Sequence, residues 1–190
     1  IERVLGRGPV TARAAEPALR ALLLLAPSRA YEGPLEAYVS LLDPVLGATR
    51  DSGADPRLQA SALVVRGALR RQRGQGRSGA HDLVQALAIA QALGDAGIEA
   101  RATHELGHAL ASRGETTAAI EHLERALALH RASGDRGGVG DALADLGGLL
   151  ARVERHAEAT ALLERALAVH RAEGDPIAEA HDLLQLGSIH

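Results

Sequence analysis

The sequence contains no cysteine, phenylalanine, tryptophan or methionine, and its only tyrosines are Tyr31 and Tyr38. Without cysteine the chain can form neither disulfides nor thiolate metal sites. Any hydrophobic core must therefore be built from Leu, Ala, Val and Ile, which supply nearly all of the 46% hydrophobic fraction. Because Ala and Leu are strong helix formers, and Ala-rich faces let helices approach closely, this composition favours packed helices.

Lysine and asparagine are also absent. We interpret their absence as the coding bias of a GC-rich, and therefore bacterial, genome. The formal net charge of −3 gives no electrostatic reason to expect binding to nucleic acid or to an anionic membrane. The apolar run Leu22–Leu25 is far too short to span a bilayer, and no signal-peptide pattern is recognisable. We therefore expect a cytoplasmic protein with neither nucleic acid nor membrane as a direct partner.

The sequence repeats itself with a period of forty residues. The strings RALALHRASGD (125–135) and RALAVHRAEGD (165–175) are offset by one period, and QALAIAQALGD (85–95) lies one period earlier. Each string ends in Gly-Asp, where Gly tolerates the positive φ that closes a helix and Asp can cap the next helix. A second break falls near the middle of each unit, at Gly74 and Gly114, where the following unit has Glu154.

Each forty-residue unit is therefore predicted to be two helices joined by a tight turn. A lone helix pair cannot bury its apolar face, but stacked pairs can, so the repeat predicts a solenoid. We expect complete units at 55–94, 95–134 and 135–174, and the first helix of a truncated unit at 175–190. Residues 16–54 are interpreted as a degenerate first unit, and residues 1–15 as a linker or the tail of an earlier unit. Because the chain starts without Met and stops within the pattern, we expect it to be part of a longer protein.

The spacing of small residues resembles that of the tetratricopeptide repeat (TPR) family. In that family a Gly or Ala is followed by Ala twelve and nineteen residues later. Two units carry the full pattern, and a third carries Gly at the middle position; these residues are Gly107, Ala119 and Ala126, then Gly147, Ala159 and Ala166, then Gly67, Gly79 and Ala86. The resemblance implies an all-α, right-handed α-α superhelix of antiparallel helix pairs. The forty-residue variant is similar to sensor arms of bacterial ATPase-type transcriptional regulators, and to scaffold and motor-adaptor proteins.

Some positions depart from the pattern of the repeat. Arg66 and Arg70 occupy columns that hold Leu in the two following units, which puts the packing of their unit in question. In the degenerate first unit Pro27 stands in the Gly column, and Pro44 is expected to interrupt the second helix. The basic stretch 66–77 is interpreted most simply as a solvated helix end and turn. The second interpretation is a site that binds an acidic peptide, and the third is a site that binds nucleic acid.

Residues 104–108 read HELGH, which matches the H-E-x-x-H pattern of zinc peptidases. Such an enzyme would use His104 and His108 as zinc ligands, Glu105 as general base and a third ligand from elsewhere. However, Leu106 and Gly107 of this motif align with Leu-Gly of the neighbouring units, so the repeat explains half of the pattern. We therefore expect no enzyme activity, no cofactor and no dedicated metal site, and keep His104 and His108 as candidate ligands of an adventitious metal.

The TPR resemblance implies a ligand groove lined by the first helix of each unit. Its candidate residues share groove-facing columns; they are His104, His108, Arg101, Asp141, His181, Arg71, Ser112 and Arg152. The alternative is that these are solvated polar side chains on an exposed face. His130 and His170 lie at predicted helix C-termini, where a partial positive charge would suit the helix dipole, and we assign them no function.

Together these features predict a non-catalytic module that binds a protein or peptide segment, or another domain of the same chain. The regulator resemblance implies that this contact controls a larger bacterial regulatory protein. A zinc peptidase is one alternative. A homo-oligomer formed through the apolar C-terminal helix is another.

Overall fold

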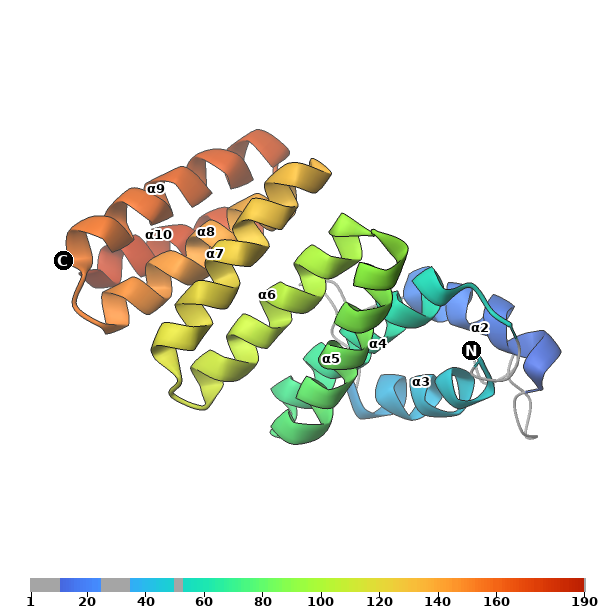
Figure 1. Ribbon diagram of the computed structural model, residues 1–190. Helices are drawn as coiled ribbons and strands as arrows, with labels where there is room; N and C mark the ends of the chain where they lie inside the picture. Colours follow the sequence, from blue (N-terminus) through green and yellow to red (C-terminus); the bar gives the residue numbers. More distant parts are fainter. Residues whose placement is uncertain (1–10, 25–34, 50–52, 190) are drawn as a thin grey trace. The chain divides into compact units, whose positions relative to one another are not determined.

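The computed structural model describes residues 11–24, 35–49 and 53–189, and all regular secondary structure in this part of the chain is helical (Figure 1). The chain divides into two compact parts, residues 1–98 and residues 99–190. The helices of the first part are α2 (Ala12–Leu24), α3 (Leu35–Thr49), α4 (Pro56–Gln72) and α5 (Gly76–Leu93). Helix α6 (Ala96–Ser112) lies mostly in the second part, followed by α7 (Thr116–Ser133), α8 (Arg136–Arg152), α9 (His156–Glu173) and α10 (Pro176–Ile189). None of the described helices is long and apolar enough to cross a membrane.

The predicted Gly-Asp junctions separate successive helix pairs. Gly94, Gly134 and Gly174 end α5, α7 and α9 with φ values of 64°, 74° and 70°. The aspartate that follows each glycine then caps the next helix. For example, Oδ1 of Asp135 accepts a hydrogen bond of 3.0 Å from the backbone N–H of Gly138. This confirms the local interpretation of the motif, because one residue supplies the left-handed conformation and the next satisfies an unpaired helical N–H.

The turn inside each pair uses the same backbone conformation in three units. Gly74, Gly114 and Glu154 have φ values of 76°, 79° and 63°. In each case the next residue donates its backbone N–H to a carbonyl in the last turn of the preceding helix, as Arg155 does to Leu150 at 2.9 Å. Glu154 thus adopts a left-handed conformation that disfavours residues with a Cβ.

The small-residue columns allow the two helices of a pair to approach closely. A Cβ added at Gly147 of α8 would lie 2.7 Å from Cγ of Leu163 on α9, and Gly107 faces Leu123 in the same way at 2.8 Å. Leu163 and Leu123 are fully buried, so they cannot easily move aside. The core of the second part contains Ala119, Leu123, Leu127, Ala142, Leu143, Ala144, Leu146, Leu149, Leu163 and Ala166.

In the first part, Arg66 and Arg70 of α4 are accommodated by carboxylates. Arg66 pairs with Asp82 at 2.7 Å and with Asp43 at 2.9 Å, and Arg70 contacts the same two residues at 2.8 and 2.9 Å. Asp82 is 1% exposed and Arg66 is 7% exposed. Burial by itself would lower the pKa of Arg66, but the two carboxylates raise it. The interpretation of residues 66–77 as wholly solvated is therefore wrong at Arg66.

Two further expectations concern the N-terminal residues. Pro44 does not interrupt its helix, because α3 runs continuously from Leu35 to Thr49. Helix α2 begins at Ala12, within the segment expected to be a linker. Residues 1–10 of that segment, and Pro27, lie outside the described residues.

Candidate functional site

An open groove of about 510 Å³ lies in the second part of the chain and is lined mainly by first helices of the pairs, α6, α8 and α10. The lining residues are His108, Ala111, Ser112, Leu123, Asp145, Gly148, Leu149, Arg152, His181 and Gln185. Four of the residues expected from the sequence are therefore brought together, namely His108, Ser112, Arg152 and His181. Their side chains come from three different helices, so the groove exists only when the pairs are stacked.

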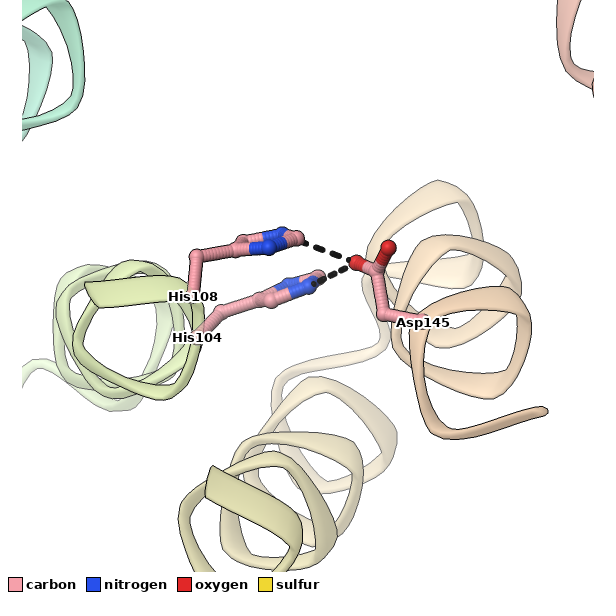
Figure 2. A group of neighbouring side chains, drawn as sticks. All are labelled: His104, His108 and Asp145. Carbon is pink, nitrogen blue, oxygen red and sulfur yellow. Dashed lines mark hydrogen bonds and ion pairs between the residues drawn. The ribbon is translucent and has the colours of Figure 1, made fainter. Parts of the chain in front are cut away.

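Two histidines of α6 converge on one carboxylate of α8 (Figure 2). Nε2 of His104 lies 2.7 Å from Oδ2 of Asp145, and Nε2 of His108 lies 2.9 Å from the same oxygen. The two imidazole rings are stacked, with centroids 5.1 Å apart and planes inclined by 11°. His104 is buried, whereas His108 and Asp145 are half-buried at the groove wall. We call these three residues the His-His-Asp cluster.

The hydrogen bonds of the cluster keep Asp145 ionised. Burial alone would raise the pKa of Asp145, but the hydrogen bonds from His104 and His108 outweigh this effect and hold the pKa far below its ordinary value. An ionised carboxylate can only accept hydrogen bonds. Each imidazole must therefore carry a proton on Nε2 to make its contact with Oδ2.

The other groove candidates occupy different surroundings. Arg101 is exposed and contributes to the electrostatic environment of Asp135 and His130, and Asp141 places Oδ1 3.4 Å from Nε2 of His170. Neither of them lines the groove. Arg71 belongs to the first part of the chain, whereas the groove is formed by residues of the second part. Glu105, the general base of the peptidase hypothesis, is not among the ligand-type residues grouped around Asp145.

His130 and His170 are buried links between consecutive helices. Nδ1 of His130 contacts Asp135 at 2.9 Å, and Nδ1 of His170 contacts the fully buried Asp182 at 2.6 Å. Burial is the largest cause of a lowered pKa at His130, which is 2% exposed, so the expected partial positive charge is not favoured there. Each histidine fixes the next pair to the end of the preceding helix.

Sequence reasoning did not identify Asp145 as part of this site. It lies forty-one residues after His104, one repeat plus one position, in a column that holds Glu105 and Gln185 in the adjacent units. Neighbouring repeats place such residues side by side. A polar residue in the next unit, 41 positions after His104 and 37 after His108, is thus the signal that could have found it.

Comparisons with known proteins agree with the helical architecture. The family model described as tetratricopeptide repeat matches residues 99–172. Aspartyl phosphate phosphatase F from Bacillus subtilis aligns with 96% of this chain at a TM-score of 0.75 and 11% identity, and this chain spans 46% of its length. BtubC (BKLC) from P. vanneervenii aligns over 99% of this chain and 76% of its own length, at a TM-score of 0.76 and 21% sequence identity.

A third similar structure contains the nearly identical TPR-like repeats of a Podosopora anserina protein described as a kinesin light chain. It aligns with 92% of this chain and 86% of its own, at a TM-score of 0.68 and 20% identity. At these identities the structures establish the fold alone. Among curated proteins, no match to the sequence was found.

Proposed function

We propose that the chain, whose residues 99–172 match the tetratricopeptide-repeat model, is a non-catalytic module that binds a protein or peptide segment in the groove of its second part. The observation that carries this proposal is the groove itself, whose lining combines Ala111 and the buried core residues Leu123 and Leu149 with polar groups from three helices. Apolar surface with a few fixed polar groups suits a side chain that inserts from a partner segment. We propose that the module consists of the repeat units that the sequence predicts, 55–94, 95–134 and 135–174.

Arg152 favours a partner that carries a carboxylate, because Asp145, the carboxylate of the groove wall, is already paired with His104 and His108. Arg152 is exposed at the groove, and its guanidinium has no hydrogen bond or ion pair with any residue in the described part of the chain. An arginine can bind a carboxylate through two parallel hydrogen bonds. His181 and Ser112 add further polar groups on α10 and α6. A segment with an acidic side chain among apolar ones fits this arrangement.

The cellular setting follows from the resemblance of the forty-residue unit to sensor arms of bacterial regulators. In such a protein the bound segment is another domain of the same polypeptide or a separate partner, and binding shifts an inactive–active equilibrium in the cytoplasm. The composition, with Arg in place of every Lys, supports a bacterial source.

A phage-displayed random peptide library selected on the whole chain tests the groove. We expect enriched peptides that contain Asp or Glu, and that bind about tenfold more weakly to an Arg152→Ala/His181→Ala variant by fluorescence anisotropy. Arg165→Ala is the matched control, because Arg165 is an exposed arginine of α9 that does not line the groove. Equal binding to the wild type and the groove variant, or no enrichment at all, would overturn the proposal.

The zinc peptidase remains the competing hypothesis, because the His-His-Asp cluster adds a third ligand-type residue to the HELGH motif. It requires Glu105 to act on a metal-bound water. Fluorogenic casein incubated with the zinc-loaded chain distinguishes the two functions. Cleavage that is abolished by Glu105→Gln would establish the peptidase, whereas we expect no cleavage.

Self-association is favoured by one feature of α10. Its side chains of Ile177, Leu183 and Leu184 are exposed, and Leu184 is 74% exposed. Exposed apolar side chains that cluster on one helix can serve as a contact surface between copies. Light scattering that shows a constant monomer mass over a wide concentration range would exclude this role.

A further inference from the structure

The His-His-Asp cluster gathers three ligand atoms within a few ångströms of one another. Nε2 of His104, Nε2 of His108 and a carboxylate oxygen of Asp145 all lie within 4.8 Å of one another. Figure 2 shows both imidazoles extending from α6 in the same direction, toward the single carboxylate on α8. Nitrogen and oxygen donors gathered from two neighbouring helices are the groups that hold a metal ion in many protein sites.

Two of the three ligand–ligand separations in the cluster, those that involve Asp145, are close to those of a tetrahedral metal site. With metal–ligand bonds of about 2.0–2.1 Å, neighbouring ligand atoms are roughly 3.3 Å apart. The observed separations from Oδ2 of Asp145 are 2.7 Å to His104 and 2.9 Å to His108. The carboxylate therefore needs to retreat by only about half an ångström to admit an ion. A rotation of the Asp145 side chain lengthens both contacts. The two Nε2 atoms lie within 4.8 Å of each other, and rotation of the stacked imidazoles adjusts that third separation.

The supporting structure holds the ligands in place. His104 and His108 are one helical turn apart, and their stacked rings restrict each other. The ring of His130 packs edge-on against His104, with centroids 5.6 Å apart. On the same helix, Gly107 packs against Leu123 of α7, which anchors α6 between the two histidines. Little conformational entropy is then lost when an ion binds.

The chemistry of the donors selects the kind of ion. A metal ion would replace the two Nε2 protons and keep the contact with the ionised carboxylate. Two imidazoles and one carboxylate suit zinc and the neighbouring divalent transition metals, whereas magnesium and calcium prefer all-oxygen sites. Because His108 and Asp145 also line the groove, the remaining coordination positions are accessible to water from that side.

The repeat fold does not account for these three residues. The columns of His104 and His108 hold Ala144 and Gly148 in the next unit, and the column of Asp145 holds Gln185. Those residues sit in equivalent helices, so packing requires neither a histidine nor an aspartate at these positions. We propose that His104, His108 and Asp145 form a binding site for one zinc-type divalent metal ion in the groove wall. This proposal does not depend on the identity of any partner segment.

Metal titration of the tag-free full chain, stripped with chelator and dialysed, tests the site. With Zn²⁺ we expect one equivalent to bind in calorimetry, and with Co²⁺ we expect absorption bands typical of a four- or five-coordinate site with nitrogen ligands. Asp145→Asn and His108→Gln should each weaken Zn²⁺ binding by roughly tenfold or more. Circular dichroism establishes that each variant remains helical.

Two control variants separate this site from other histidines. Glu105→Gln alters the HELGH motif outside the cluster, and His122→Gln removes a half-buried imidazole on α7. Both should bind Zn²⁺ as the wild type does. Wild-type binding that Asp145→Asn leaves unchanged, or binding that His122→Gln weakens as much, would show adventitious binding and overturn the proposal.

A measurement on the wild type keeps the test valid if a variant fails to fold. NMR of the ¹⁵N-labelled imidazoles should show that Zn²⁺ changes the Nε2 signals of His104 and His108, and leaves those of the remaining histidines in place. Unchanged Nε2 signals of these two residues at saturating Zn²⁺ would contradict the site directly.

Discussion

Arg66 and Asp82 form a two-point ion pair between α4 and α5, with Nε–Oδ2 at 2.9 Å and Nη2–Oδ1 at 2.7 Å. The pair occupies positions that hold Leu146 and Leu162 two repeats later. Polar residues thus replace an apolar contact of the repeat, and the arrangement is stable because Asp43 and Arg70 complete the network. A buried pair of this kind depends strongly on both partners.

Asp82→Ala should lower the free energy of unfolding by about 3–5 kcal/mol, because it leaves buried Arg66 without its main partner. The double variant Arg66→Leu/Asp82→Leu restores the apolar pair of the later repeat. We expect it to be more stable than Asp82→Ala in urea unfolding followed by circular dichroism. If the double variant is no more stable than Asp82→Ala, the ion-pair network stabilises the fold by more than neutralising the charge of Arg66.

Gly147→Ala should destabilise the protein by about 1–3 kcal/mol, since the new Cβ would meet the fully buried Leu163 and the carbonyl oxygen of Ala159. Gly187 is the matched control, because it occupies the same column in α10 but has no atom within 4 Å of an added Cβ. Gly187→Ala should raise stability by up to about 1 kcal/mol, through higher helix propensity. Thermal unfolding of the two variants should therefore shift in opposite directions.

Glu154→Gly should stabilise the protein by about 0.5–1 kcal/mol. It relieves a left-handed conformation, with φ of 63°, that glycine adopts at the equivalent Gly74 and Gly114. Glu154→Ala keeps the Cβ and should give no such gain. Equal stability of the glycine and alanine variants in chemical denaturation would contradict the explanation based on backbone strain.

Asp135→Ala should lower the free energy of unfolding by about 1 kcal/mol at neutral pH, because α8 loses its N-cap. Burial raises the pKa of Asp135, but the Gly138 N–H, His130 and Arg101 lower it below its ordinary value overall. The Asp135 charge therefore contributes fully to the free energy of unfolding above the unfolded-state pKa of about 3.9. This contribution is lost as pH falls through the pKa of Asp135 in the folded protein.

The stability difference between wild type and Asp135→Ala should accordingly be smaller at pH 3 than at pH 7. Asp135→Asn retains an N-cap acceptor without the charge, so it separates the two effects. Urea unfolding of the three proteins at both pH values checks this prediction. A difference between wild type and Asp135→Ala that does not shrink at pH 3 would show that the charge of Asp135 contributes nothing.

The sequence by itself determined the helix pairs, because their signals are local. Gly134 and Asp135 end one helix and cap the next within two residues, and Gly147 permits a close approach wherever its helix packs. The forty-residue period then indicated which helices are equivalent. The groove positions His108, Ser112, Arg152 and His181 were reachable from the same register, and their role in binding stays a prediction.

Only the tertiary structure decided which polar side chains meet. Asp145 receives two histidines from a helix one repeat earlier, and Arg66 finds Asp82 across its own pair and Asp43 from α3. Such contacts depend on side-chain direction and on the spacing of stacked helices, and helical periodicity specifies neither. The same holds for His130, whose burial lowers its pKa and so disfavours the charge that a helix C-terminus would otherwise favour.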